Sequence, residues 1–226
     1  MNNRHKPVRI RFLFSIIILL VITFAQQQDP KPQRYRDDIN EFLRWDSKNS
    51  YQQSATLFVG SSSIRMWQTA RAFPDNYVIN RGFGGSHISD VNYYYDKIVK
   101  KYQPAQIVFY AGDNDIAAGK SPEQVLQDYT IFSNKIDKDL PDTKIFYLPI
   151  NPSLSRWNVW DEMKITNRWI KEYIETKKNH FYVDIATPML KKYGKPDSTI
   201  FLDDGLHLNN KGYQIWNEVL EDYIKN

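Results

Sequence analysis

An aspartate and a histidine near the C-terminus, Asp204 and His207, have the residue types and the spacing of a general-base pair. In a helical turn, side chains three residues apart share one side of the backbone with their Cβ atoms about 5–6 Å apart, so Asp204 can accept a hydrogen bond from one imidazole nitrogen. The other nitrogen is then free to take a proton from a hydroxyl nucleophile. The pair therefore favours a hydrolase.

A candidate nucleophile lies far upstream, in the three serines that follow Gly60. Each part alone has a plainer interpretation, because Asp and His beside glycine commonly form a turn or a helix cap, and Gly-Ser-Ser-Ser is ordinary loop composition. Comparison with the other three histidines favours the catalytic interpretation of His207. His5 lies in a basic leader, His87 in a glycine-rich loop, and His180 in what we expect to be an exposed turn, so only His207 has a carboxylate three residues upstream.

Residues 1–25 have the pattern of a secretory signal peptide, in which basic residues precede an uncharged apolar run of 14 residues from Phe12 to Ala25. A membrane-spanning helix needs about 20 apolar residues. We therefore expect cleavage after Ala25 and an exported protein, periplasmic or secreted. The competing interpretation is an uncleaved N-terminal membrane anchor. The basic residues of the leader are Arg4, Lys6, Arg9 and Arg11.

Charge and composition exclude several classes of partner. The chain has 30 basic and 26 acidic side chains, and removal of the four leader cations would leave 26 of each. The basic excess therefore belongs to the export signal, and we expect no nucleic-acid partner. The absence of cysteine excludes thiol catalysis, disulfides and cysteine-ligated metal. We expect no metal and no cofactor, because the aspartates near the predicted site lie on separate segments without a ligand pattern: Asp113, Asp115, Asp203 and Asp204.

Short apolar, β-rich runs alternate with amphipathic segments along residues 37–226, which we expect to form one domain after a short tether at residues 26–36. The alternation predicts an α/β fold, a three-layer α/β/α sandwich around a five-stranded parallel sheet. The capping box that begins at Ser121 marks one helix. The predicted strands are residues 56–59, 77–80, 106–110, 144–150 and 181–184, and the other predicted helices are residues 88–101, 163–177 and 210–224.

Ligands of open parallel sheets bind at the carboxyl ends of the strands. Gly60–Ser62 ends the first predicted strand, and glycine-containing segments at residues 82–85 and 112–115 follow the second and third. Glycine after a strand can serve only to make a turn, but three such segments, together with the distal Asp-His pair, predict one polar site at this edge.

Four ordered blocks of sequence resemble the SGNH hydrolase superfamily, also called GDSL esterases, and within it the branch of the platelet-activating-factor acetylhydrolase catalytic subunits. The blocks are residues 58–62, residues 80–85, the G-x-N-D of residues 112–115 and the D-x-x-H of residues 204–207. The resemblance covers most of residues 37–226 and implies a flavodoxin-like fold. The α/β-hydrolase fold fits less well, because its G-x-S-x-G elbow would place glycine where Ile64 stands.

The resemblance implies that Ser62 is the nucleophile, His207 its base and Asp204 the residue that orients the base. It also implies three oxyanion-hole donors, the Ser62 N–H, the Gly85 N–H and the Asn114 side-chain amide. One departure from the family pattern concerns the residue before the nucleophile, which is usually Asp and is Ser61 here, so that the choice among three adjacent serines rests on the register from Gly60.

These features predict a serine esterase that acts on small-molecule or glycan esters, with short acyl groups such as acetyl, because the chain has no lid-sized apolar insertion. Two alternatives stay open: an exported O-acyltransferase with the same triad, and a non-catalytic module that binds glycan or lipid. Arg156 and Trp157 lie where they can line the substrate site or simply pack against the domain. The sequence does not predict an oligomeric state.

Overall fold

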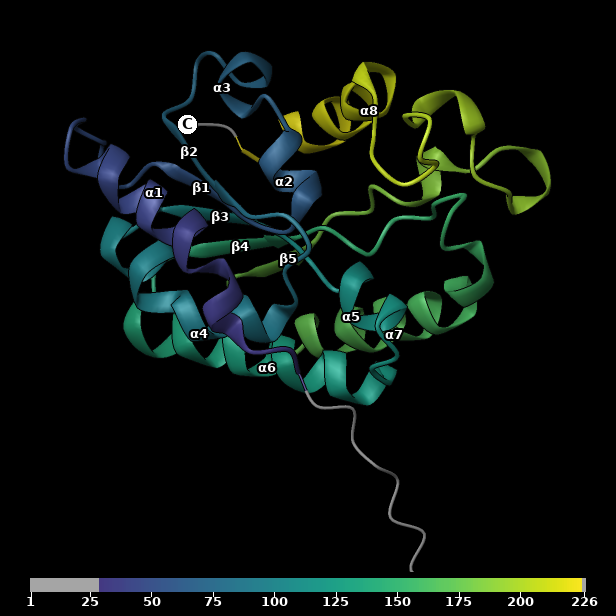
Figure 1. Ribbon diagram of the computed structural model, residues 1–226, viewed down its shortest axis with the longest axis horizontal. Coiled ribbons are helices and arrows are strands. Elements are labelled where there is room, and N and C mark those ends of the chain that lie inside the picture. The colour runs from purple at the N-terminus through teal and green to yellow at the C-terminus, as the bar shows by residue number, and fades with distance from the viewer. Residues whose placement is uncertain (1–28, 225–226) are drawn as a thin grey trace, which may run out of the picture.

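The computed structural model describes residues 29–224 (Figure 1). The predicted signal peptide and the start of the predicted tether lie outside these residues. Five strands form one parallel sheet in the order β2-β1-β3-β4-β5, with helices on both faces, which confirms the predicted three-layer α/β/α sandwich. The strands are β1 (Thr56–Gly60), β2 (Val78–Gly82), β3 (Gln106–Tyr110), β4 (Lys144–Tyr147) and β5 (His180–Tyr182).

The helices divide between the two faces of the sheet (Figure 1). On one face lie α1 (Arg36–Asp46), α4 (Ile88–Ile98), α5 (Asp113–Ala117), α6 (Pro122–Asp139) and α7 (Trp160–Ile174). On the other lie α2 (Ser62–Met66), α3 (Thr69–Ala72) and α8 (Asn210–Glu221). Short 3₁₀ turns join them: η1 (Pro32–Tyr35), η2 (Lys100–Tyr102), η3 (Trp157–Val159), η4 (Thr187–Met189), η5 (Lys192–Gly194) and η6 (Ser198–Ile200).

The sheet separates two hydrophobic cores. Leu57 and Val59 point into the core under α1, α4, α6 and α7, whereas Phe58 points into the core under α2, α3 and α8. This alternation follows from the two-residue period of a strand, and cover on both faces explains why residues 57–59 of β1 are all apolar. Among residues 29–224, none of the helices has both the length and the apolar character needed to cross a membrane.

Local signals set several helix boundaries. The predicted capping box at Ser121 is formed, because its hydroxyl accepts the N–H of Gln124 and the Gln124 side chain accepts the N–H of Ser121. Several element bounds differ from expectation by one to three residues, among them those of β2, β5, α4, α7 and α8. Helix α1 begins at the end of the predicted tether, and β4 ends at Tyr147, three residues before the predicted end.

The expectation of an exposed turn at His180 is wrong. This residue begins β5, and its side chain is only 1% exposed. Its ring lies 3.0 Å from the carboxylate of Asp137 on α6, a partner 43 residues away that local sequence does not indicate.

Candidate active site

The nucleophile candidate lies on a sharp strand-to-helix turn. Strand β1 ends at Gly60 with φ of +145°, and a Cβ at this position would lie 1.8 Å from the carbonyl oxygen of Tyr110 on β3. Only glycine fits this conformation and this close approach. Helix α2 begins two residues later, so Ser62 occupies its first position at the carboxyl edge of the sheet.

The Asp204–His207 segment is a turn that is closed by its own aspartate, not the helical turn that the spacing suggested. One Asp204 carboxylate oxygen accepts the N–H groups of Leu206 and His207, both at 2.9 Å, and Gly205 takes a φ of +63°. An aspartate that bonds the backbone ahead of it is a common turn device. The turn holds the His207 ring on the same side as the second carboxylate oxygen, which is the arrangement that the spacing predicted.

The His207 turn meets Ser62, a residue 145 positions earlier in the chain, so that three side chains lie in a line. His207 Nδ1 lies 2.6 Å from Asp204 Oδ2, and His207 Nε2 lies 3.0 Å from Ser62 Oγ. With Asp204 ionised, Nδ1 carries the proton that it donates to the carboxylate, and Nε2 is left to accept the Ser62 hydroxyl. The arrangement is that of a Ser-His-Asp triad in which the imidazole can take the serine proton.

The electrostatics keep Asp204 charged. The hydrogen bond from His207 is the largest influence and, with the backbone N–H groups, lowers the pKa of Asp204 to about 2. The carboxylate is therefore ionised at neutral pH. The His207 side chain is 23% exposed, so its ring is open to a substrate.

The three adjacent serines have different surroundings. Ser62 Oγ contacts the imidazole, whereas Ser61 is fully buried and its hydroxyl has no hydrogen-bond partner. The backbone explains this difference, because the Ser61 N–H is tied to the carbonyl of Tyr110 at 3.0 Å and its side chain faces inward. The geometry supports the register counted from Gly60.

The predicted oxyanion donors come from the ends of β1, β2 and β3. Ser62 is in the first turn of α2, where N–H groups have no intrahelical acceptor. Gly85 has φ of +77°, a conformation that favours glycine. Asn114, on α5, donates from Nδ2 to the Ser86 carbonyl at 3.1 Å, and this nitrogen has a second proton for a ligand.

Arg156 takes a position that the sequence did not indicate. Its guanidinium donates to the Asp113 carboxylate and, at 2.7 Å, to Asn114 Oδ1. A guanidinium only donates, so this contact fixes which end of the Asn114 amide carries the oxygen and turns Nδ2 toward Ser86. Asp113 and Ser86 are supporting residues that we missed, because no local pattern links Asp113 to an arginine 43 residues away or Ser86 to an asparagine 28 residues away.

Trp157 lies in η3 and directly follows Arg156 in the sequence. Its side chain is partly buried against the core that also contains Trp160 and Met163 of α7. Its ring stacks on Trp160, with ring centroids 5.9 Å apart and planes 18° apart. The role of Trp157 as a substrate contact stays a prediction.

The aspartates near the site are engaged in separate contacts. Asp113 binds Arg156, Asp204 binds His207, and the fully buried Asp115 binds Lys120 at 3.0 Å. Across residues 29–224, no group of three or more His, Cys, Asp or Glu side chains is placed to hold a metal ion.

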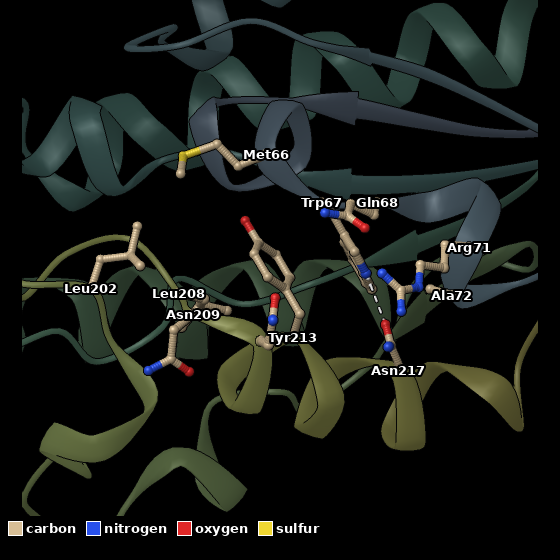
Figure 2. Close-up of a pocket in the computed structure, with 11 residues that line it drawn as sticks. Met66, Trp67, Gln68, Arg71, Ala72, Leu202, Leu208, Asn209, Tyr213 and Asn217 are labelled. Carbon is tan, nitrogen blue, oxygen red and sulfur yellow. Dashed lines mark hydrogen bonds between the residues drawn. The ribbon is translucent and has the colours of Figure 1, made fainter.

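A cavity of about 540 Å³ lies beside the nucleophile helix, between α2, α3 and α8 (Figure 2). Trp67 and Tyr213 form part of its wall, and the Trp67 indole donates to Asn217 Oδ1 at 2.8 Å. Ser62, Asp204 and His207 are not among its lining residues. The Tyr213 hydroxyl donates to the Ser63 carbonyl at 2.8 Å, so this wall also supports the backbone next to Ser62.

The comparison with known families agrees with this geometry. The model of the GDSL-like lipase/acylhydrolase family matches residues 55–215. The chain belongs to this family. The matched span contains Ser62, Gly85, Asn114, Asp204 and His207, and the resemblance to SGNH hydrolases seen in the four sequence blocks is confirmed.

Solved structures of similar fold include hydrolases of the same family. A Streptococcus pneumonia protein named as a platelet activating factor has a TM-score of 0.76 at 21% identity, over 85% of this chain and 94% of that one. A GDSL-like lipase from Bacteroides thetaiotaomicron has a TM-score of 0.69 at 20% identity, over 81% and 95%. An acetyl-xylooligosaccharide esterase from Geobacillus Stearmophilus has a TM-score of 0.60 at 14% identity, over 79% and 98%. No curated protein matches this chain.

Proposed function

We propose that this GDSL-family hydrolase is a serine esterase in which Ser62 is the nucleophile, His207 the general base and Asp204 the residue that orients the base. One observation carries the proposal. The Ser62 hydroxyl lies 3.0 Å from His207 Nε2 while Asp204 holds the opposite ring nitrogen at 2.6 Å. A serine hydroxyl becomes a useful nucleophile when an oriented imidazole can remove its proton in this way.

The proposed reaction has two halves. Ser62 Oγ attacks the ester carbonyl as its proton passes to Nε2 of His207, and the carbonyl oxygen takes the negative charge. The C–O bond to the alcohol then breaks, and the imidazolium gives its proton to the departing oxygen, which leaves Ser62 acylated. Water attacks the acyl group with the same imidazole as base, and the carboxylic acid departs as Ser62 regains its proton.

The oxyanion in each half would be held by the Ser62 N–H, the Gly85 N–H and Asn114 Nδ2. Donors fixed before the reaction stabilise developing charge without reorganisation, and one of them is typically worth about 10²–10³ in turnover. In this proposal Arg156 acts through Asn114: its 2.7 Å hydrogen bond to Oδ1 keeps the amide nitrogen facing the site. Arg156 is thus a positioning residue.

The surroundings of His207 support a short acyl group. The apolar side chains that border its turn include Leu154 and Leu202, each 43% exposed. The Leu154 N–H donates to the Gly205 carbonyl, and the Leu202 N–H donates to the His207 carbonyl. Two half-exposed leucines offer contact for a few methylene groups but little for a long chain. We therefore propose acetyl-type esters, and acetyl groups on sugars accord with the acetyl-xylooligosaccharide esterase among the structural neighbours.

A chain-length series tests the substrate class. Along p-nitrophenyl esters from acetate to palmitate, we expect kcat/KM to fall beyond about four to six carbons, whereas an enzyme that buried the chain would gain about 0.8 kcal/mol per CH₂. Activity that rises with chain length would contradict the short-acyl proposal. Transfer of the acetyl group to an added sugar, in preference to water, would favour the O-acyltransferase alternative that shares the acyl-enzyme. Binding of glycan or lipid without turnover of any ester would favour the non-catalytic module.

We also propose that the protein is exported and cleaved after Ala25, on the basis of the leader pattern in residues 1–25. Fractionation of the native host with intact-mass measurement tests this. A mature N-terminus at Gln26 outside the cytoplasmic membrane is expected. A protein that keeps residues 1–25 in the membrane fraction would instead support an uncleaved anchor.

A further inference from the structure

The segment Asp29–Tyr35, which precedes α1, lies along α4 and the glycine loop that carries Gly85. The Pro32 carbonyl accepts the hydroxyl of Tyr94 on α4 at 3.0 Å. The Arg34 guanidinium forms an ion pair of 2.7 Å with Asp90, whose side chain is only 2% exposed. A segment that was expected to be a simple tether is thus held by specific contacts. We call Asp29–Tyr35 the strap.

The C-terminal end of the strap packs directly on the oxyanion loop. Tyr35 is buried, and its ring meets Phe83 edge to face with ring centroids 4.9 Å apart. A Cβ on Gly85 would lie 3.2 Å from the Tyr35 hydroxyl oxygen, so the phenol is adjacent to the Gly85 backbone. Glycine has a mobile backbone, so the conformation of Gly85 depends on its neighbours, and Tyr35 is one of these neighbours.

The N-terminal end of the strap enters a buried charge cluster. Asp29 Oδ1 lies 2.5 Å from Lys120 Nζ and 3.2 Å from His87 Nδ1. Burial raises the pKa of the Asp29 carboxyl, but the bonds and charge of Lys120, with His87, outweigh this effect and leave the pKa below its usual value. The cluster therefore stabilises the charged form of Asp29, which in turn ties the strap to the end of the glycine loop.

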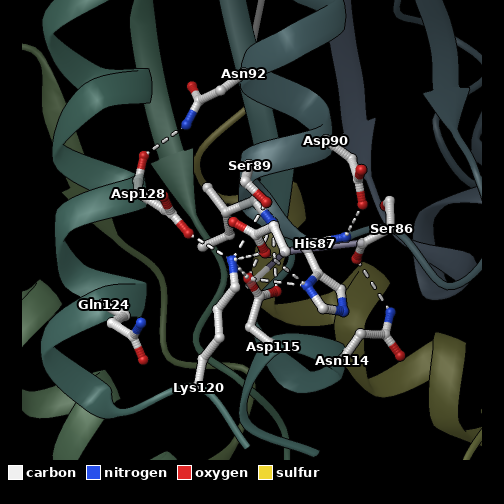
Figure 3. Close-up of polar contacts among 12 residues, drawn as sticks. Ser86, His87, Ser89, Asp90, Asn92, Asn114, Asp115, Lys120, Gln124 and Asp128 are labelled. Atoms are coloured by element: carbon white, nitrogen blue, oxygen red, sulfur yellow. Dashed lines mark hydrogen bonds and ion pairs between the residues drawn. The ribbon is translucent and has the colours of Figure 1, made fainter. Parts of the chain in front are cut away.

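The other side of the same loop contacts Asn114, which is another of the proposed oxyanion donors. Figure 3 shows Lys120 between Asp115 and Asp128, with His87 beside this group and Asn114 reaching the carbonyl of Ser86. The loop between Phe83 and His87 is thus held by the strap on one side and contacts the Asn114 amide on the other. A shift of this loop would move Gly85 and release Asn114 together.

We propose that the strap is a positioning element for the oxyanion hole: the ion pairs of Asp29 and Arg34 keep Tyr35 packed on the glycine loop, so that the Gly85 N–H and the Asn114 amide point at one oxygen. This inference rests on the proposed esterase function. Oxyanion contacts become strong only as charge develops in the transition state, so loosening the strap should lower kcat while KM changes little.

The test removes both ionic links of the strap in the full chain, as Asp29→Ala with Arg34→Ala. Lys120 would keep Asp115 at 3.0 Å and Asp128 at 2.7 Å, so the buried ammonium stays paired. We expect kcat for p-nitrophenyl acetate to fall about tenfold, less than the 10²–10³ of a lost donor, with KM within about twofold. Asp29→Ala with Arg34→Lys, which keeps a cation near Asp90, should lose less of the rate than the variant with both alanines.

The matched control is Lys100→Ala with Asp139→Ala, which removes a 3.2 Å ion pair between η2 and α6. It should leave kcat unchanged. Hydrogen exchange gives a readout apart from activity. Amides of residues 82–87 should exchange faster in the strap variant than in the unmodified protein, and should not do so in the control. Both variants should keep the melting temperature of the unmodified protein.

Unchanged kcat and unchanged loop exchange in the strap variant would overturn the proposal, as would equal losses in kcat for the control. Failure of the proposed function has a different signature, because the unmodified protein would then turn over no ester. The exchange experiment would still test the strap in that case. If amides of the loop exchanged at the rate of the unmodified protein in both variants, the positioning role of the strap would be rejected.

Discussion

Within residues 29–224, two Ser-His-Asp arrangements can be compared, and they differ in where the fold places them. The first joins Ser62, His207 and Asp204 at the carboxyl edge of the sheet. In the second, Ser133 Oγ lies 3.4 Å from His180 Nδ1 and His180 Nε2 lies 3.0 Å from Asp137, on α6 and the start of β5. The same three residue types thus occur at hydrogen-bonding distance in both.

The two arrangements differ in their exposure to solvent. The His180 side chain is 1% exposed and Ser133 is fully buried, whereas the His207 side chain is 23% exposed. Ser133 lies in the middle of α6, where its own N–H is used by the helix, and its hydroxyl also contacts the Tyr173 hydroxyl at 3.1 Å. The difference teaches that a hydroxyl, an imidazole and a carboxylate in a row do not make a nucleophile. Access and free N–H donors beside the hydroxyl are also required.

The largest expected effect comes from replacing the serine of each arrangement. Ser62→Ala should lower kcat/KM for p-nitrophenyl acetate by at least about 10⁴-fold, because only the oxyanion donors and binding remain. Ser133→Ala should stay within about twofold, and Ser61→Ala and Ser63→Ala should keep a substantial fraction. Steady-state kinetics on folded variants decides this, and equal losses at Ser61, Ser62 and Ser63 would reject the proposed register.

The second prediction concerns the aspartates of the two arrangements, Asp204 and Asp137, with Asp203 as a neighbouring control. Asp204→Asn should lower kcat by about 10²–10⁴, since the amide favours the wrong imidazole tautomer. Asp137→Asn and Asp203→Asn should affect turnover far less. Because hydrogen bonds hold the pKa of Asp204 at about 2, no loss of activity above pH 4 should arise from protonation of Asp204. A larger loss at Asp203 or Asp137 than at Asp204 would contradict the assignment.

A smaller effect is expected at the residue behind the oxyanion hole. Arg156→Met should free the Asn114 amide to rotate and lower kcat about tenfold, with less change in KM, whereas Asn114→Ala should cost about 10²–10³. The two changes should not be additive, because Arg156 acts through Asn114. A double variant whose loss equals the product of the single losses would show that Arg156 has a separate role.

The smallest expected effect is on thermal stability, and it concerns His180 in the buried arrangement. Burial is the largest influence on His180 and lowers its pKa, despite the opposing effect of Asp137. The unfolded chain therefore binds the proton more readily, so stability is present above the unfolded pKa of about 6.5 and is lost as pH falls through the lower folded value. We expect Tm to fall from pH 7.5 to 5, and to fall less in His180→Gln. Equal Tm shifts in the two proteins would contradict this.

Local patterns in the sequence were enough to predict the sheet and the line of catalytic candidates. Strand β1 has an apolar run at residues 57–59 and ends at a glycine, which places Ser62 at the carboxyl edge. Asp204 and His207 are close enough in sequence to be paired by a single turn. The prediction of a helical turn there was wrong in detail, because Asp204 closes the turn by accepting two backbone N–H groups.

The contacts that sequence reasoning missed join residues far apart in the chain. Arg156 meets Asn114 across 42 residues, His180 meets Asp137 across 43, and His87 meets Asp29 across 58. Such pairs depend on how β4, α6 and the N-terminal segment are packed, and no local periodicity specifies them. For the same reason the supporting roles of Asp113 and Lys120 emerged only from the three-dimensional arrangement.

The most direct test of the central claim is covalent labelling with a fluorophosphonate, which reacts only with an activated serine. Peptide mapping by mass spectrometry should find one adduct per chain, on Ser62, and the adduct should be lost in His207→Ala and retained in His180→Ala. An adduct on Ser61, Ser63 or Ser133, or no adduct on the folded protein, would contradict the account.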